Sequence, residues 1–128
     1  MQTTADLLRA AKAEIADETK WTQYTLARDS NGNALEIACD PGAVCFCTFG
    51  AIMKVSGYNV EQAYWNHSIP ALDETKRLHM LVQAVENLRE YAKKEMIGDT
   101  NDSSTHPQVM EWFDKAIERA VQREAEYG

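Results

Sequence analysis

A single Asn-Gly pair constrains this chain most, because it stands between two short stretches of alternating apolar and polar residues. Asn31-Gly32 favours a type I′ hairpin turn, which needs positive φ at both central residues. With that pair at the tip of a hairpin over residues 24–37, Leu26 would face Ile37. One face would then carry Tyr24, Leu26, Leu35, Ile37 and Cys39. An isolated hairpin is marginally stable in water, so we expect this apolar face to pack on helices.

Residues 40–57 predict a buried helix. Asp40 is the expected N-cap, Pro41 lies in the first turn, and Gly57 is the expected C-terminal stop. The middle of this stretch, AVCFCTFGAIM, is apolar on every face. A helix that is apolar all round lies in the interior of a protein. We therefore expect this helix to be the central element of the core.

Four further helices are predicted from capping residues and from apolar residues at helical spacing. The first starts at a capping box, Thr3-x-x-Asp6, and a short one runs from Asn59 to before Pro70. The longest runs from Asp73 or Glu74 to Gly98, and the last is capped by Thr105. The stretch DTNDSST before the last helix reads as a polar loop. Residues 1–128 are therefore expected to form a single, mainly α domain. Its predicted fold is about five helices around a central buried helix, with one two-stranded β-hairpin.

Composition and charge narrow the classes of function. The 128 residues are 45% hydrophobic, which is typical of one globular domain. A formal net charge of −7 opposes binding to nucleic acid or to anionic membranes, and no apolar run approaches the roughly 18 residues of a membrane span. The first residues show no secretory signal, and the odd count of three cysteines suggests free thiols. We expect a cytoplasmic protein with no nucleic-acid or membrane partner.

The cysteines and histidines allow two catalytic interpretations. Cys45 or Cys47 could be a nucleophile with His106 as its base, but both cysteines would lie beyond the first turn of a helix capped at Asp40, where the helix dipole fades. Small buried thiols are the alternative interpretation. For zinc, the chain has enough potential ligands but no C-x-x-C or H-x-x-x-H spacing. We expect no metal and no cofactor.

Two polar segments predict a ligand pocket more directly. The segment NDSSTHPQ contains Asn101, Asp102, Thr105 and His106, and residues 21–23 read WTQ. An aromatic wall with a few convergent polar groups is the usual composition of a small-ligand pocket. Capping by Thr105 and one Asx residue, with Trp21 as a core side chain, is the alternative interpretation.

These motifs resemble a family of small uncharacterised bacterial and phage proteins. The shared pattern is WTQ, a D-x-x-G hairpin, C-x-x-G-A from Cys47, N-D, T-H and a final D-x-A-I helix, in the same order over nearly the whole chain. Thr100 stands where the family has Trp, and Ser104 stands where it has Arg. If that arginine binds an anion in the relatives, the activity is lost or altered here. The family is a domain of unknown function, so the resemblance implies site positions and no reaction.

Two functions follow as hypotheses. The first is a non-catalytic binding module, for which the resemblance allows a phage origin, that engages a protein partner or a small ligand. The second is a small Cys-His enzyme acting on an acyl or amide substrate, with Cys47 as nucleophile and His106 as base. For the binding module, the predicted ligand-binding residues are motif positions of the resemblance: Trp21, Gln23, Cys47, Asn101, Asp102, Thr105 and His106.

Overall fold

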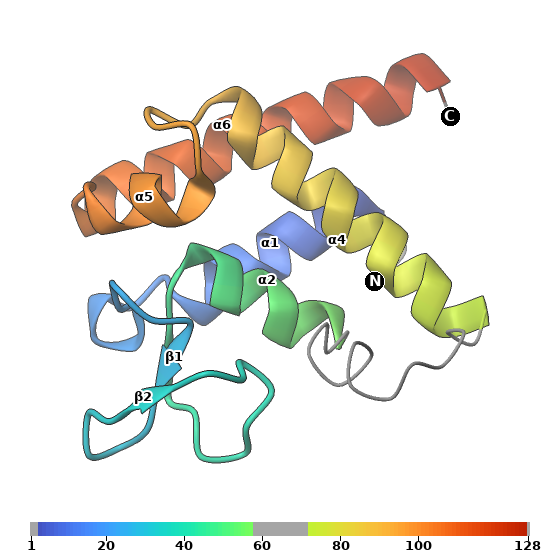
Figure 1. The fold of residues 1–128 in the computed structure, drawn as a ribbon. Coiled ribbons are helices and arrows are strands. Elements are labelled where there is room, and N and C mark those ends of the chain that lie inside the picture. The colour runs from blue at the N-terminus through green and yellow to red at the C-terminus, as the bar shows by residue number, and fades with distance from the viewer. Residues whose placement is uncertain (1–2, 58–71, 128) are drawn as a thin grey trace.

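The computed structural model describes residues 3–57 and 72–127, and the part it describes is mainly helical, as predicted (Figure 1). Five α-helices and three short strands lie in these residues. The helices are α1 (Thr4–Glu14), α2 (Thr48–Ser56), α4 (Leu72–Glu90), α5 (Ile97–Asp102) and α6 (His106–Tyr127), with a short 3-10 helix, η1 (Glu18–Lys20). The strands are β1 (Ala27–Arg28), β2 (Ala34–Leu35) and β3 (Cys45–Phe46).

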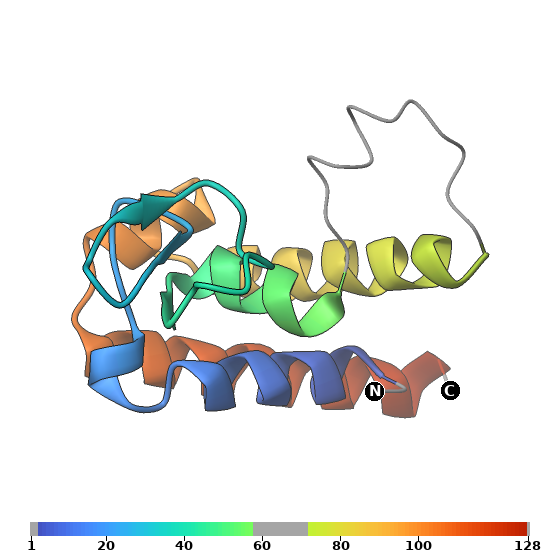
Figure 2. The same cartoon turned by 90° about the horizontal axis from the view of Figure 1, so that it is seen from below.

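The helices form two layers, with the sheet at one end. Figure 2 shows α1 and α6 side by side in one layer, and α2 and α4 in the other. Helix α5 contacts α2 and α4, and its Asn101 side chain is bonded to the start of α2. The core between the layers is apolar, with Leu8, Ile52, Leu88 and Phe113 fully buried. Burial of these apolar side chains between the two layers drives the helices together.

Two predicted helix starts are confirmed by their capping bonds. The Thr3 hydroxyl accepts a hydrogen bond from the Asp6 amide at 3.1 Å. At α6, the Thr105 amide donates to the Gln108 side chain at 2.9 Å, and the Gln108 amide donates back to the Thr105 hydroxyl at 3.3 Å. Such reciprocal bonds satisfy amides that have no partner within the helix. Helix α6 therefore starts at His106, as the sequence predicts.

The predicted start of the second helix is wrong. Asp40 caps a turn instead, because its carboxylate accepts from the Gly42 amide at 2.8 Å and its carbonyl accepts from the Ala43 amide at 3.0 Å. Residues 45 and 46 then form β3, and α2 begins only at Thr48. The predicted end is right, because Gly57 leaves the helix with φ of 69°.

The segment between α4 and α6 also differs from the prediction. Helix α4 ends at Glu90 rather than near Gly98, and the expected polar loop contains the short helix α5. The Thr100 hydroxyl donates to the Met96 carbonyl at 3.0 Å and accepts from the Lys94 amide at 3.1 Å. Through these bonds the Thr100 side chain pairs with backbone groups of the residues just before α5. The predicted short helix from Asn59 lies outside the described residues.

The hairpin turn lies where the sequence predicts it, but its register differs by one residue. Ala27 pairs with Leu35 and Arg28 with Ala34, and β1 also pairs with β3 to give the strand order β2-β1-β3. The sheet is therefore three-stranded rather than two-stranded. A one-residue shift exchanges the two faces of a strand. Ala27 is accordingly buried, whereas Tyr24 is 76% exposed.

The turn itself explains the register. Gly32 has φ of 83°, whereas Asn31 does not have positive φ, so the turn is not type I′. The Asp29 carboxylate accepts from the amides of Asn31 at 2.9 Å and Asn33 at 3.0 Å, and the Asp29 carbonyl accepts from Gly32 at 3.0 Å. These bonds fit a three-residue loop that ends in a left-handed glycine. Because this loop has three residues rather than two, the pairing of β1 with β2 shifts by one residue.

Gly50 positions the start of α2 against the β1 segment. A Cβ atom at Gly50 would lie 2.0 Å from the Leu26 carbonyl oxygen. This distance is too short for any residue with a side chain at position 50. The same carbonyl accepts a hydrogen bond from the Cys47 amide at 3.1 Å. A glycine one turn after Cys47 thus allows the two backbones to approach closely.

Candidate functional site

The predicted polar residues meet at Asn101, a fully buried side chain on α5. Its Oδ1 accepts from the Trp21 indole at 2.8 Å, from the Thr48 amide at 3.0 Å and from the Thr48 hydroxyl at 2.8 Å. Its Nδ2 donates to the Thr22 carbonyl at 3.1 Å. A buried polar group is stable only when it is hydrogen-bonded, and Asn101 meets this requirement. It joins residues 21–22, the start of α2 and α5.

Gln23 and Asp102 strengthen the same junction. The Gln23 side-chain nitrogen donates to the carbonyls of Asn101 at 3.2 Å, Asp102 at 3.1 Å and Ser104 at 3.0 Å. The Asp102 carboxylate accepts from the Tyr24 amide at 2.8 Å. Gln23 therefore satisfies carbonyls at the end of α5, and Asp102 holds the chain that leads into β1.

His106 and Thr105 lie at the start of α6. The Nε2 atom of His106 lies 2.7 Å from the Ile15 carbonyl oxygen, a distance that requires the protonated Nε2 of the imidazole as donor. The His106 ring lies beside the Trp21 ring, with centroids 5.7 Å apart and planes tilted by 55°. Thr105 is exposed and acts as the cap already described. The structure thus brings Trp21 and His106 together, whereas Thr105 faces solvent.

Cys47 is the N-cap of α2, not a residue in its middle as the sequence predicts. Its sulfur accepts from the Gly50 amide at 3.3 Å, and the residue is only 6% exposed. Burial raises the pKa of the Cys47 thiol above its ordinary value, an effect that the amides of Gly50 and Phe49 oppose in part. In the described part of the chain, no hydrogen bond joins Cys47 to His106.

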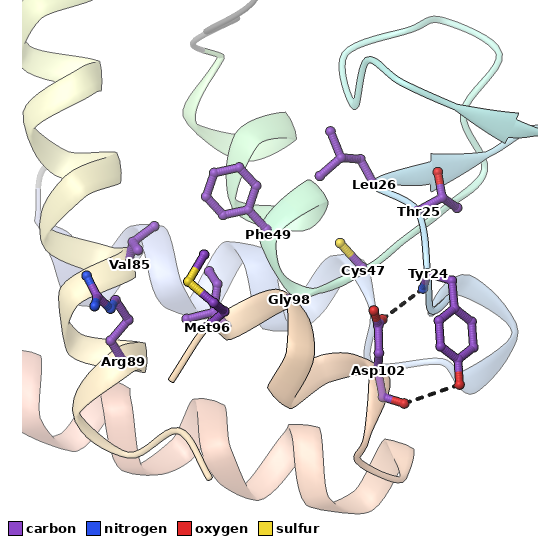
Figure 3. Close-up of a pocket in the computed structure, with 11 residues that line it drawn as sticks. Tyr24, Thr25, Leu26, Cys47, Phe49, Val85, Arg89, Met96, Gly98 and Asp102 are labelled. Atoms are coloured by element: carbon purple, nitrogen blue, oxygen red, sulfur yellow. Dashed lines mark hydrogen bonds between the residues drawn. The ribbon is translucent and has the colours of Figure 1, made fainter. Parts of the chain in front are cut away.

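A cavity of about 490 Å³ lies beside this junction (Figure 3). Two of the seven predicted site residues, Cys47 and Asp102, line it, whereas the other five support it from behind or lie elsewhere. The remaining lining residues are Tyr24, Thr25, Leu26, Phe49, Val85, Arg89, Met96, Ile97 and Gly98. The cavity therefore lies between the β1 segment (residues 24–28), the start of α2, the second half of α4, and α5.

The lining is mostly apolar, with a charged side chain on each side. Figure 3 shows Arg89 on α4 at one side and Asp102 at the other, with Phe49 and Met96 between them. Met96 is 60% exposed at the rim. A mostly apolar lining with a few polar groups is the usual composition of a small-molecule site.

Tyr24 lines the cavity, although the sequence prediction for its position is wrong. It was expected on the buried face of the hairpin, yet it lines the cavity with its ring largely exposed. Within residues 3–57 and 72–127, it is also the one residue other than glycine with positive φ, at 71°. Its hydrogen bonds to Asp102, from the amide and from the hydroxyl, hold this strained conformation.

Arg89 was missed for a different reason. The sequence around it, NLREYAKKEM, alternates charges as an ordinary solvated helix surface does. Position along α4 alone could not distinguish Arg89 from its charged neighbours. The only sequence signal for Tyr24 was its place directly after WTQ.

Across residues 3–57 and 72–127, no three His, Cys, Asp or Glu side chains are grouped so that they could hold a metal ion. None of the helices described is both long and apolar enough to cross a membrane.

The fold and the cavity define a small helical domain with a three-stranded sheet at one end and an apolar site beside its buried asparagine. Residues 1–119 match a family of unknown function, DUF6197, and the chain belongs to this family. No curated protein and no solved structure matches the chain.

Proposed function

We propose that this chain is a non-catalytic binding module whose ligand is a small molecule held in the cavity beside Cys47 and Asp102. The observation behind this proposal is the cavity itself, which is apolar, about 490 Å³ in volume and lined by two of the predicted site residues. Small-molecule sites commonly have volumes of about 300–1,000 Å³. The cavity volume therefore suits a small molecule.

The hydrogen bonds around Asn101 support this proposal, because they form a rigid frame behind the cavity. Asn101, Gln23 and Asp102 fix the relative positions of the β1 segment, α2 and α5, which are three of the four walls. A binding site keeps its shape when its walls are locked by hydrogen bonds behind them. In this view Trp21, Gln23, Asn101 and His106 act as positioning residues, and the ligand contacts Cys47 and Asp102.

The Cys-His enzyme is the less favoured hypothesis on geometric and electrostatic grounds. A nucleophilic cysteine needs a lowered pKa and a base within reach, whereas burial raises the pKa of Cys47. The His106 imidazole is already engaged by the Ile15 carbonyl. The three cysteines are free thiols, which supports our inference of a reducing, cytoplasmic location.

Binding can be tested with a neutral apolar fluorophore, N-phenylnaphthylamine, whose emission rises when it leaves water. We expect the wild-type protein to bind it and Gly98→Phe to bind it weakly. Gly98 lines the cavity, and a Cβ atom there would meet no atom within 4 Å, so a ring can occupy the open space without disturbing the fold.

Gly98→Ala is the matched control, because it adds a helix-favouring methyl group but leaves the cavity open. Circular dichroism should show both variants folded. If the wild type does not bind the fluorophore, or if Gly98→Phe binds it as well as Gly98→Ala does, the proposal is wrong.

A further inference from the structure

We infer that the ligand of this cavity is an amphipathic anion, with an apolar body and one acidic group that pairs with Arg89. This inference rests on the proposed function and names the chemical class of the ligand. It starts from the hydrogen bonds and ion pairs of the arginines in the described residues.

Four of the six arginines have polar partners within the protein. Arg9 pairs with Asp6 at 3.4 Å, Arg28 donates to the Thr22 hydroxyl at 2.8 Å, Arg119 lies 3.6 Å from Glu90, and Arg123 lies 2.6 Å from Glu90. Arg77 and Arg89, both on α4, make no hydrogen bond or ion pair with any residue that the structure describes. Of these two, Arg89 lines the cavity, on the side opposite Asp102.

The acidic neighbours of Arg89 do not neutralise it. Glu90, the next residue, is held by Arg119 and Arg123. Glu86, one turn earlier on α4, makes no ion pair with Arg89 among the interactions of the described residues. A planar guanidinium with free donors, at the edge of an apolar cavity, is suited to bind a carboxylate or sulfonate through two parallel hydrogen bonds.

The opposite side of the cavity sets the orientation of the ligand. The Asp102 carboxylate lies there, bound through Oδ1 to the Tyr24 amide and to the side-chain nitrogen of Asn101. Its negative charge excludes an acidic group from that side. The acidic group must therefore lie at Arg89, and the apolar body of the ligand lies against Leu26, Phe49 and Val85 (Figure 3).

The net charge of the chain makes the inference specific. At −7 the protein repels anions as a whole, so affinity for an anion has to come from a local cation at the site. Binding of an acidic ligand should consequently depend on Arg89 in particular rather than on the basic residues in general.

Two related probes test this inference: anilinonaphthalene sulfonate, which is anionic, and N-phenylnaphthylamine, which lacks the sulfonate. We expect Arg89→Gln to weaken binding of the anionic probe roughly tenfold or more, because a charged hydrogen-bond partner is lost. Binding of the neutral probe should be unchanged. Arg89→Lys should retain part of the affinity, because it keeps the charge but loses the paired donors.

Arg77→Gln is the matched control. It removes an arginine that also lacks a polar partner in the described residues and lies on the same helix, about 18 Å away along the axis. This variant should bind both probes as the wild type does. Thermal unfolding should be the same for all three variants, since Arg89 and Arg77 hold no other described residue in place.

The outcomes separate the inference from the proposed function. If Arg89→Gln binds both probes like the wild type, or if the wild type binds only the neutral probe, the inference is wrong and the proposed function stands. Equal weakening of both probes by Arg89→Gln would also overturn the inference. If the wild type does not bind the neutral probe, the proposed function fails, and the inference that rests on it fails too.

Discussion

At the scale of single residues, Asn101 holds together the segments that form the walls of the cavity. It makes five hydrogen bonds, to Trp21, Thr22, Thr48 and Asp102. Loss of the Asn101 side chain would leave several of these groups unpaired, and each unpaired buried group costs about 1–3 kcal/mol. Its buried position therefore indicates a structural role that supports the walls of the cavity.

Cys47 leads to a prediction about thiol reactivity. Burial raises the pKa of the Cys47 thiol, so the reactive thiolate is scarce in the folded protein. The neutral thiol contributes stability below the ordinary pKa of a cysteine, and this contribution is lost as the pH rises through the higher pKa of the folded state. We expect a variant that keeps only Cys47, with Cys39→Ser and Cys45→Ser, to react with a disulfide reagent far more slowly than an unstructured thiol at mildly alkaline pH. Absorbance of the released thiolate measures the rate.

Two controls define this thiol experiment. The same variant in guanidinium chloride should react at the rate of a free thiol. A variant that keeps only Cys39, an exposed cysteine, should react quickly while folded. Fast reaction of Cys47 in the folded protein would contradict the burial argument and favour the Cys-His enzyme.

At the scale of elements, the hairpin depends on one left-handed residue. Gly32 has φ of 83°, which a β-branched side chain strongly disfavours, although a Cβ atom there would meet no neighbour. We expect Gly32→Val to lower the free energy of unfolding by about 1–2 kcal/mol, measured by urea denaturation.

Gly32→Asn is the matched control for this turn, because asparagine tolerates positive φ. It should lose clearly less stability than Gly32→Val. Equal losses for the two variants would show that something other than backbone conformation makes glycine necessary.

At the scale of the whole molecule, the second half of α6 joins α1 and α4. Arg123 donates to the Asn87 side chain at 2.5 Å and to Glu90 at 2.6 Å, and Glu124 accepts from the Ala5 amide at 3.1 Å. These residues follow the matched range 1–119 of the family. They fix α4, and thereby Arg89, relative to the lower layer of helices in Figure 2.

Removal of this connection should weaken the fold. We expect Arg123→Ala to lower the free energy of unfolding by about 1 kcal/mol in urea denaturation, a modest value because the Arg123–Glu90 pair is partly exposed. Lys115→Ala removes an exposed ion pair on the same helix and serves as the control. It should change stability by less than about 0.5 kcal/mol. A larger loss for Lys115→Ala than for Arg123→Ala would contradict this role of α6.

Local sequence determined the features whose physical causes are also local. The starts of α1 and α6 at Thr3 and Thr105 and the end of α2 at Gly57 follow from capping bonds and backbone conformation within a few residues. The position of the turn at Gly32 is local for the same reason. The family resemblance also predicted Asn101 and Cys47 as site residues, and the structure places both at the start of α2.

Tertiary structure alone decided the rest, because the partners are far apart in the sequence. Residues 45 and 46 are apolar enough for a helix, but β1 offers them backbone partners, and they form a strand. Trp21 and Asn101 bond across 80 residues. The cavity lies where residues 24–26, α2, α4 and α5 meet, and the packing of α4 at that place brings Arg89 into its lining.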